Sequence, residues 1–136
     1  MRFTIKEYNE YHEQEILNLY KSVGWVNYVN YPEMIKNAYK GSLKILGAYD
    51  EEKLLGIIRV VGDGYSIIYI QDIIVLPEYQ HQGIGTALIN KMTEIYKNVY
   101  QKVLLTDDTD KTIQFYQSVG FRADTELGCK AFVKMG

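Results

Sequence analysis

Residues 67–87 read IIYIQDIIVLPEYQHQGIGTA, and this stretch does most to decide the fold. An apolar run ends at Pro77, a short polar segment follows, and apolar residues then recur at helical spacing from Ile84. The predicted order is therefore strand, turn and helix. Gly83 and Gly85 lie where the helix begins, and glycines there let the backbone approach a ligand closely. Free N–H groups and the helix dipole at this end favour an anion such as a pyrophosphate.

A Gly-x-Gly pair also opens dinucleotide-binding loops, but the surrounding sequence argues against that class. Leu88 occupies the position of the third glycine, and the strands before the loop are joined as hairpins, with no second βαβ unit. The Gly-Lys-Ser/Thr of a Walker A loop is missing as well. A pyrophosphate site of another class is therefore expected.

Short elements precede and follow this stretch. Apolar spacing and turn residues upstream predict a strand over 3–8, helices over 12–23 and 32–39 with an irregular aromatic segment between them, and strands over 43–49, 53–61 and 65–76. Downstream they predict a helix over 83–99, a strand over 103–105, a helix capped by Asp108 or Thr109 that ends at Gly120, and a hairpin of strands 121–123 and 130–135. The crossover helix makes the strand over 103–105 parallel to the one that ends at Leu76.

This order of elements predicts one domain over residues 1–136 in the α+β class, as an α/β three-layer arrangement. The sheet is expected to be mixed, mostly antiparallel and twisted, with about six to seven strands flanked by about four helices. A chain of 136 residues is long enough to bury a hydrophobic core.

The composition is that of an ordinary globular protein, with 47% apolar residues and a formal net charge of −2. That balance favours neither nucleic acid nor an anionic membrane as a partner. Every apolar run is broken by polar residues before it could span a bilayer. Cys129 is the only cysteine, so an intramolecular disulfide is excluded and a cytoplasmic location is expected. Two histidines and one cysteine cannot form a conventional zinc site without carboxylates, so no metal is expected.

Two patterns in the chain resemble the GNAT superfamily of N-acetyltransferases. The first, Val75-x-Pro77-x-x-Gln80-x-x-Gly83-x-Gly85, is similar to that family's acetyl-CoA signature. The second, residues 115–121, reads FYQSVGF and resembles the family's FY-x-x-x-GF segment. The resemblance implies an acetyl-CoA-dependent N-acetyltransferase that transfers acetyl directly to a primary amine, here expected to belong to a small molecule.

The resemblance also implies which residues contact the co-substrate. In the family, the strand before the loop separates from the next parallel strand, and the pantetheine arm of acetyl-CoA enters between them. Carried over to this chain, backbone groups of Ile74 and Val75 pair with pantetheine amides. The phosphates are expected along the loop and the start of the helix, at Gln80, His81, Gln82, Gly83, Ile84, Gly85 and Thr86, with Thr109 as a further contact.

Tyr116 is the candidate catalytic residue of the second pattern. The departing acetyl group leaves a thiolate, and a phenol placed at the sulfur can protonate it or donate a hydrogen bond to it. The resemblance implies this role, because the family's tyrosine at the same motif position has it. The alternative is a tyrosine of the core, one of 13 in the chain.

Asp72 is a charged residue within an otherwise apolar strand, which is costly unless it is paired or used. One interpretation is a general base or an anchor for the acceptor amine, which must lose a proton before it attacks. The other is a carboxylate satisfied by a tyrosine, by Arg59 or by a backbone N–H. Strict alternation places Tyr69 and Gln71 on the opposite face of the strand unless a bulge intervenes. A water held by either residue is the rival to Asp72 as base.

The acceptor is expected beside the aromatic segment between the first two helices. Trp25, Tyr28 and Tyr31 flank two asparagines there, and aromatic walls with amides suit a small amine that has an apolar body. A packed loop over the sheet is the equally open alternative. Two other functions stay open: a non-catalytic acyl-CoA-binding sensor module, and an acetyltransferase of protein N-termini or lysines. The oligomeric state is open as well, with a homodimer among the options.

Overall fold

The computed structural model describes residues 2–136, and these form two compact units. The first unit ends at Leu105, and the second comprises Thr106–Gly136. A single domain over the whole chain stays a prediction.

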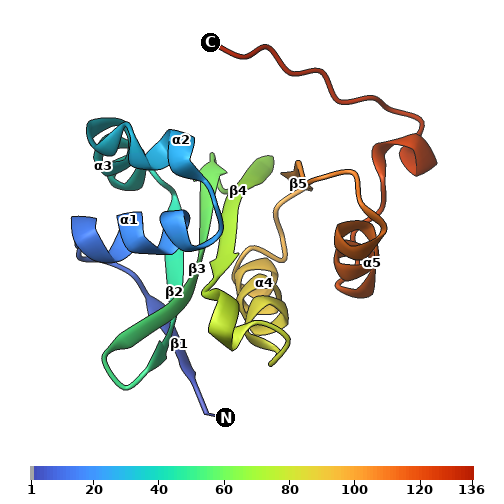
Figure 1. The fold of residues 1–136 in the computed structure, drawn as a ribbon. Helices are drawn as coiled ribbons and strands as arrows, with labels where there is room; N and C mark the ends of the chain where they lie inside the picture. The colour runs from blue at the N-terminus through green and yellow to red at the C-terminus, as the bar shows by residue number, and fades with distance from the viewer. Residues whose placement is uncertain (1) are drawn as a thin grey trace. The chain divides into compact units, whose positions relative to one another are not determined.

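Within the described residues, a five-stranded sheet forms the centre of the first unit, with its strands in the order β1-β2-β3-β4-β5 (Figure 1). The strands are β1 (Thr4–Glu7), β2 (Lys44–Asp50), β3 (Lys53–Gly62), β4 (Ile67–Val75) and β5 (Gln101–Leu104). Neighbours from β1 to β4 are antiparallel, whereas β4 and β5 are parallel. The helix between β4 and β5 provides the long crossover that a parallel pair requires.

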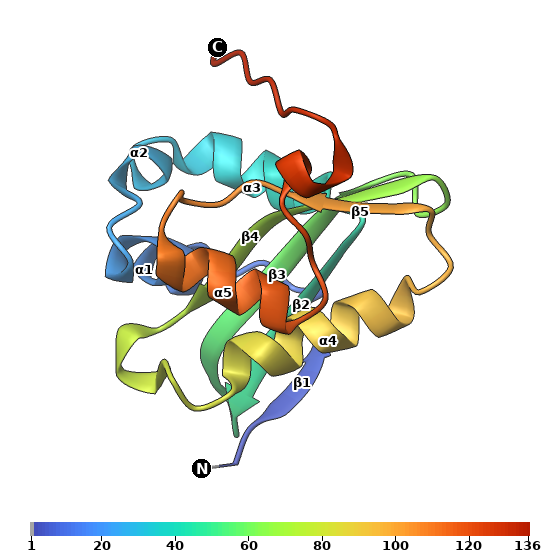
Figure 2. The same cartoon turned by 90° about the vertical axis from the view of Figure 1, so that its right-hand side faces the viewer.

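Helices cover both faces of this sheet (Figures 1 and 2). One face carries α1 (Glu13–Ser22), α2 (Val26–Val29) and α3 (Pro32–Lys40), and the other carries α4 (Ile84–Ile95). Because both faces are covered, the central strand β3 is apolar on both, and Ile57 and Ile58 are fully buried. Ile57 packs in one cluster with Ile16 and Leu19 of α1. The sheet is thus a rigid support for the residues along its edge.

Helix α1 ends in a motif that the second unit repeats. Gly24 has a φ of +82°, and the N–H of Trp25 donates to the carbonyl of Tyr20 at 3.0 Å. The rings of Tyr20 and Trp25 lie 5.9 Å apart. This is a C-terminal helix cap built on a glycine of positive φ, in which residues on both sides of the turn pack together; it is called the helix stop below. The spacing Tyr20-x-x-x-Gly24-Trp25 therefore brings Trp25 back onto the helix.

A bulge interrupts β4 at Gln71. Arg59 of β3 pairs with Asp72. The next residue of β3 pairs with Ile70, which leaves Gln71 without a partner on β3. The extra residue shifts the alternation, so Tyr69 lies on the same face of the sheet as Asp72. Strict alternation predicts opposite faces for these two residues, and that prediction is wrong because of the bulge.

The second unit holds helix α5 (Asp110–Ser118) and a 3₁₀ helix (Asp124–Leu127). Thr109 caps α5, since its hydroxyl oxygen accepts the N–H of Thr112 at 3.3 Å. Of the two caps predicted from the sequence, Thr109 is confirmed.

The hairpin predicted for residues 121–135 is wrong. In the part of the chain that the structure describes, no strand follows β5, so the sheet has fewer strands than predicted. Asp124 provides the physical reason, because its side chain accepts the N–H of Ala131 and its carbonyl accepts the N–H of Cys129. These bonds hold the segment in a tight turn, which Gly128 ends with a φ of +72°.

The α+β class predicted from the sequence is confirmed, and the other predicted helices and strands lie close to their expected positions. The aromatic segment predicted as irregular contains the short helix α2. None of the helices in residues 2–136 is long and apolar enough to cross a membrane.

Candidate functional site

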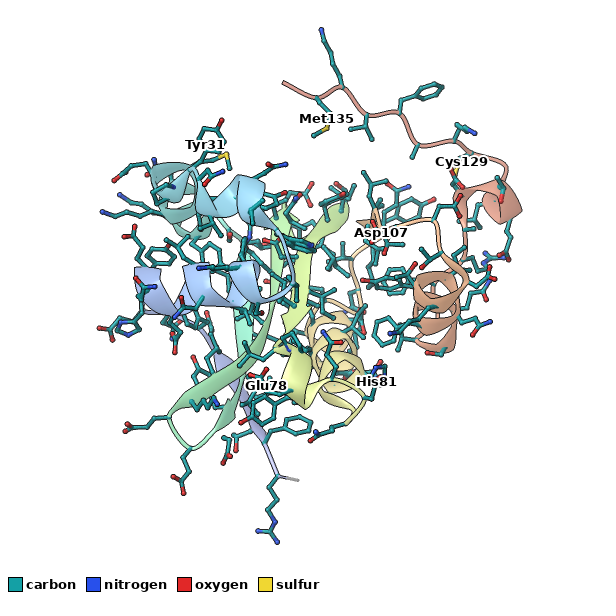
Figure 3. All side chains as sticks on the ribbon, viewed as in Figure 1. Tyr31, Glu78, His81, Asp107, Cys129 and Met135 are labelled. Atoms are coloured by element: carbon teal, nitrogen blue, oxygen red, sulfur yellow. The ribbon has the colours of Figure 1, made fainter. Side chains whose placement is uncertain are left out.

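The loop between β4 and α4 begins with a 3₁₀ helix (Pro77–Tyr79) and ends at Gly83. His81 has a φ of +63°, which residues other than glycine rarely adopt, and Gly83 has a φ of +84°. Figure 3 labels Glu78 and His81 on this loop, and both side chains are exposed. Apart from Gly83 itself and its neighbours in the chain, no heavy atom of the described residues lies within 4 Å of the position that a Cβ would take at Gly83. This side of the loop is therefore open to a ligand.

The start of α4 offers a set of backbone N–H donors. Gly83 is the N-cap, and no side chain within residues 2–136 caps the helix. The N–H groups of Ile84, Gly85 and Thr86 have no acceptor inside the helix, because they belong to its first turn. They lie at the positive end of the helix dipole, where an anion is stabilised. Gln82 precedes them as an exposed residue.

Strand β4 has a free edge beside these donors. Its pairing with β5 stops at Ile70, whereas β4 itself continues to Val75. The N–H of Leu76 donates to the carbonyl of Leu55 on β3 at 2.8 Å, so the alternation of peptide groups turns those of Val75 to the opposite edge. Within the first unit, this edge has no strand neighbour over 71–75.

The resemblance implies Ile74 and Val75 as the contacts of pantetheine, but successive residues of a strand point their peptide groups to opposite edges. Val75 lies with its peptide groups at the free edge, whereas those of Ile74 point to β3, where Ile74 pairs with Ile57. Ile73 takes the place of Ile74 at the free edge, two residues from Val75. The side-chain amide of Gln80 donates to the carbonyl of Val75 at 3.1 Å. Gln80 thus holds the loop against the end of β4.

Asp72 lies in a buried polar network on the face covered by α1 and α3, and it is 1% exposed. Its Oδ2 accepts the hydroxyl of Tyr20 at 2.6 Å and the Nε of Arg59 at 2.7 Å. Arg59 also donates to the hydroxyl of Ser42 at 3.1 Å. The hydroxyls of Tyr20 and Tyr39 share a hydrogen bond of 3.0 Å. This is the second interpretation of Asp72, a carboxylate satisfied by a tyrosine and by Arg59.

The environment of Asp72 opposes a role as general base. Its Oδ2 is already engaged by Arg59 of β3 and Tyr20 of α1, so this oxygen is held in the packed interior and is not free to contact an acceptor amine. Oδ1 of Asp72 is buried and has no hydrogen-bond partner among the described residues. The geometry favours a structural role at the bulge, where β4 leaves β5.

The residues predicted to contact the acceptor divide into two groups. Trp25 and Tyr28 pack against Tyr20, with ring centroids 5.9 and 5.5 Å away, so they adjoin the Asp72 network. Tyr31 stands apart at the start of α3 and is 62% exposed (Figure 3). Gln71 at the bulge is exposed. Burial raises the pKa of Tyr69, while a hydrogen bond with the backbone of Leu105 lowers it.

In the second unit, Tyr116 belongs to the same type of helix stop that ends α1. The N–H of Phe121 donates to the carbonyl of Tyr116 at 2.9 Å, Gly120 has a φ of +96°, and the two rings lie 6.0 Å apart. The FY-x-x-x-GF pattern thus has a local structural reason. Burial raises the pKa of the Tyr116 phenol, and a hydrogen bond with Thr106 lowers it. The hydroxyl of Thr109 is occupied as the cap of α5.

Arg59 and Tyr20, the two residues that donate directly to Asp72, were not predicted as functional residues from the sequence. Arg59 interrupts the apolar run LLGIIRVV, which is the same signal that identified Asp72 on the neighbouring strand. The pairing of Arg59 with Asp72 was accordingly one of the alternatives that the sequence left open for Asp72. Tyr20 carries no such signal, because it lies on the apolar face of α1 like a core residue.

Alkaline conditions should reduce the free energy of unfolding once the pH exceeds about 10. Burial raises the pKa of both Tyr20 and Tyr39 above the ordinary value of 10.0, so above that pH the folded chain holds protons that the unfolded chain has lost. Stability then falls with pH, and below that value both states keep the protons. Urea unfolding from about pH 8 to 11 measures this slope. Tyr20→Phe should flatten it, whereas the exposed Tyr65→Phe should not, and equal slopes in all three proteins would refute the argument.

Within residues 2–136, no three histidine, cysteine, aspartate or glutamate side chains are grouped so that they could hold a metal ion.

Comparison with known proteins identifies close relatives. The family model of the acetyltransferase (GNAT) domain matches residues 41–123. A GNAT-family acetyltransferase from Streptococcus pneumoniae is 38% identical, with a TM-score of 0.90 over 99% of this chain and 98% of the other. The PaiA N-acetyltransferase of Thermoplasma acidophilum, solved in complex with coenzyme A, has the same fold, with 19% identity and a TM-score of 0.74 over 91% of this chain and 92% of the other.

Curated proteins match over a shorter segment. The chloroplastic GCN5-related N-acetyltransferase 2 of Arabidopsis thaliana is 37% identical over 78 residues, which are 56% of this chain and 30% of that protein. This chain therefore spans less than a third of that relative's length.

Proposed function

The chain belongs to the GNAT acetyltransferase family, and we propose that it transfers acetyl from acetyl-CoA directly to the primary amine of a small molecule. The observation that carries the proposal is the free edge of β4 beside the uncapped start of α4. Unpaired peptide groups suit the amides of pantetheine, and a row of N–H donors suits a pyrophosphate. The residues present therefore fit this co-substrate.

Backbone groups do most of the binding in this proposal. Val75 and Ile73 pair with pantetheine, and the first-turn N–H groups of α4 hold the pyrophosphate. The loop over 77–83 contains no arginine or lysine, so the helix dipole is the source of positive potential there. Bound acetyl-CoA supplies a thioester carbonyl carbon, which the amine nitrogen attacks.

Tyr116 donates a proton to the thiolate that leaves. Its raised pKa keeps the phenol protonated at neutral pH, as a donor requires. The support for this role is the FY-x-x-x-GF pattern and its helix stop, which fixes the start of the Tyr116 side chain against Phe121.

The proton of the acceptor amine goes to water rather than to Asp72. Asp72 is buried and its Oδ2 is engaged by Arg59, so it is poorly placed to contact the amine. Gln71 is exposed at the bulge, and Tyr69 lies on the same face as Asp72. We assign the water to one of these two side chains.

A screen for acetyl-CoA-dependent release of free thiol tests the proposal. Polyamines, arylalkylamines, amino acids and aminoglycosides are the small amines to compare, with lysine-containing and free N-terminal peptides beside them. Turnover of a small amine supports the proposal. Turnover of peptides alone would instead assign protein acetylation, and co-substrate binding without turnover of any amine would assign a sensor module. Because Cys129 is a single exposed cysteine, we also propose a reducing, cytoplasmic location.

Gly85→Val should abolish the stabilisation that acetyl-CoA gives to the native state. Wild type should gain about 2.7 kcal/mol at about a hundredfold excess over the dissociation constant. A branched side chain in the first turn of α4 would block the close approach of the pyrophosphate. Thermal unfolding with and without acetyl-CoA measures the shift. Asn90→Val is the control, because it places the same residue on an exposed position of the same helix. An unchanged thermal shift in Gly85→Val would show that the pyrophosphate does not bind at this loop.

A further inference from the structure

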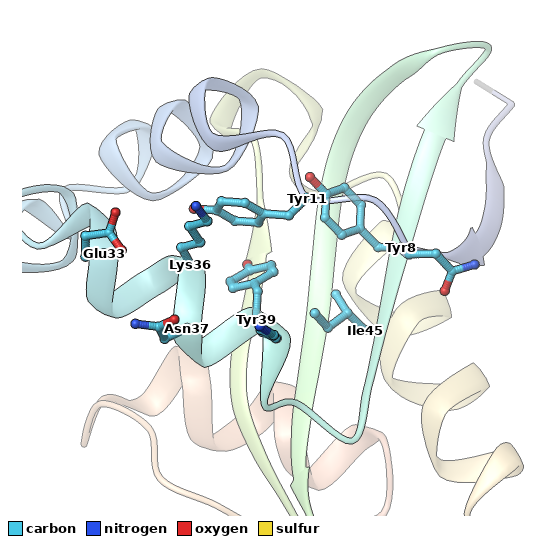
Figure 4. A pocket seen from close by; sticks show the side chains of 9 residues that line it. Tyr8, Tyr11, Glu33, Lys36, Asn37, Tyr39 and Ile45 are labelled. Carbon is cyan, nitrogen blue, oxygen red and sulfur yellow. The ribbon is translucent and has the colours of Figure 1, made fainter.

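A pocket of about 490 Å³ opens on the sheet face that carries α1 and α3, opposite to α4 (Figure 4). Three of its residues come from the segment between β1 and α1, five from α3 and one from β2. The volume lies within the range of small-molecule sites. None of these residues lies on β4, on the loop over 77–83 or on α4, so the pocket is separate from the proposed acetyl-CoA site. Its lining is Tyr8, Asn9, Tyr11, Glu33, Lys36, Asn37, Tyr39, Lys40 and Ile45.

Aromatic rings form one wall of the pocket. Tyr39 lies between Tyr8 and Tyr11, with ring centroids 6.2 and 5.3 Å away. Ile45 of β2 is buried behind them. Figure 4 shows the three rings converging from α3 and from the segment before α1. Such a wall suits a flat, apolar group, which can lie against the rings.

Hydrogen-bond donors line the pocket as well. Lys36 and Lys40 are four residues apart on α3 and therefore share one face of the helix. The ion pairs found among residues 2–136 do not include either lysine. Asn37 lies between the two lysines in sequence, and Glu33 is the one acidic residue in the lining. The two lysines outnumber the one carboxylate of the lining, which favours an anion at the lysine side of the pocket.

Tyr11 gives an independent indication. Its hydroxyl is buried, and it has no hydrogen-bond partner among the described residues. A buried hydroxyl without a partner is unfavourable, and an acceptor atom from a ligand would satisfy it. Burial and the nearby carboxylates of Glu13 and Glu33 raise the pKa of Tyr11, so the phenol stays a donor.

We propose that this pocket binds a small organic carboxylate with a flat apolar body. The carboxylate is received by Lys36 and Lys40, with the Tyr11 hydroxyl as a further donor, and the apolar body lies against Tyr39. This site is a second one, independent of acetyl transfer, and its ligand is neither acetyl-CoA nor the acceptor amine.

Calorimetric titration with phenylacetate tests the proposal, and neutral phenylacetamide serves as the matched probe. Phenylacetate should bind at one site per chain, and phenylacetamide about tenfold more weakly, because it lacks the charge that the lysines recognise. Binding should weaken as salt is added. Saturating coenzyme A should leave the affinity unchanged, since the two sites are separate.

Variants locate the binding. The double variant Lys36→Gln/Lys40→Gln should weaken phenylacetate binding about tenfold or more. Lys21→Gln/Lys91→Gln makes the same change in net charge at exposed positions outside the pocket and should have no effect. Tyr11→Phe should weaken binding several-fold without lowering the melting temperature, because the lost hydroxyl has no partner in the native state.

Any of four results would overturn the proposal. One is the absence of saturable phenylacetate binding to wild type. The second is equal affinity for phenylacetate and phenylacetamide, which would show that the lysines do not recognise charge. The third is an equal effect of the two double lysine variants, and the fourth is displacement by coenzyme A, since either would put the anion outside this pocket.

Discussion

Arg59→Met should lower the free energy of unfolding by about 3–5 kcal/mol, the largest stability loss that we expect from a single substitution in this chain. The side chain of Arg59 is 6% exposed and that of Asp72 is fully buried, with 2.7 Å between Nε and Oδ2. Methionine has a similar length but no charge, so Asp72 would remain buried with only the Tyr20 hydroxyl as a partner. Urea denaturation at neutral pH measures the loss.

The double variant Arg59→Met/Asp72→Leu separates the ion pair from the packing around it. Removing both charges leaves no uncompensated carboxylate, so most of the lost stability should return. Lys44→Met is the control, because it breaks the partly exposed pair with Glu7, at 3.4 Å, and should cost less than about 1 kcal/mol. A loss in the double variant as large as in Arg59→Met would contradict the argument. It would show that the loss of stability comes from the packing of the Arg59 side chain rather than from the unpaired charge of Asp72.

The pair also has a consequence for the proposed site. Asp72 and Arg59 face each other at the step next to the Gln71 bulge, and β4 leaves β5 at Ile70. A fixed cross-strand pair at this level opposes a slip of register, which would move the bulge and the free edge with it. We therefore expect Asp72→Asn to lower stability and to leave the shape of the pH–rate profile unchanged. A shift in that profile would instead restore Asp72 as the base or as the anchor of the amine.

Tyr116→Phe should reduce turnover by about ten- to a thousandfold, since it removes the proton that we assign to the leaving thiolate. Phenylalanine retains the aromatic ring, whose centroid lies 6.0 Å from that of Phe121. The backbone carbonyl that accepts the N–H of Phe121 is also unchanged. The dissociation constant of acetyl-CoA should therefore stay close to that of wild type. Steady-state kinetics with a turned-over amine, together with titration of the co-substrate, measures both quantities.

Tyr100→Phe is the matched control, because this tyrosine is exposed and the change is the same. Its turnover should equal that of wild type. If Tyr116→Phe weakens co-substrate binding as much as turnover, Tyr116 has a packing role. If it turns over at the wild-type rate, the assignment of the phenol as proton donor is wrong.

Local rules account for what the sequence predicted well. The period of apolar residues identified the helices and strands, and Gly83 and Gly120 marked the start of one helix and the end of another, as the structure has them. The β4–loop–α4 segment was predictable because its turn, its N-cap and its free N–H groups depend on residues close together in the chain. The same holds for the contact of Tyr116 with Phe121, which are five residues apart.

Contacts between distant residues decided the rest. Tyr20 and Asp72 are 52 residues apart, and nothing in either local sequence indicates that their side chains meet. The bulge at Gln71 follows from the register between β3 and β4. It places Tyr69 on the same face of the sheet as Asp72, where strict alternation predicts the opposite face. The failed hairpin has a local cause that the apolar pattern misses, because Asp124 accepts the N–H groups of Cys129 and Ala131, and these bonds hold the segment in a turn. The sequence by itself therefore determined the order of elements and the glycine loop, since these depend on near neighbours. Only the tertiary structure decided which charges pair and which edge of β4 stays free, because both depend on how strands far apart in the chain are aligned.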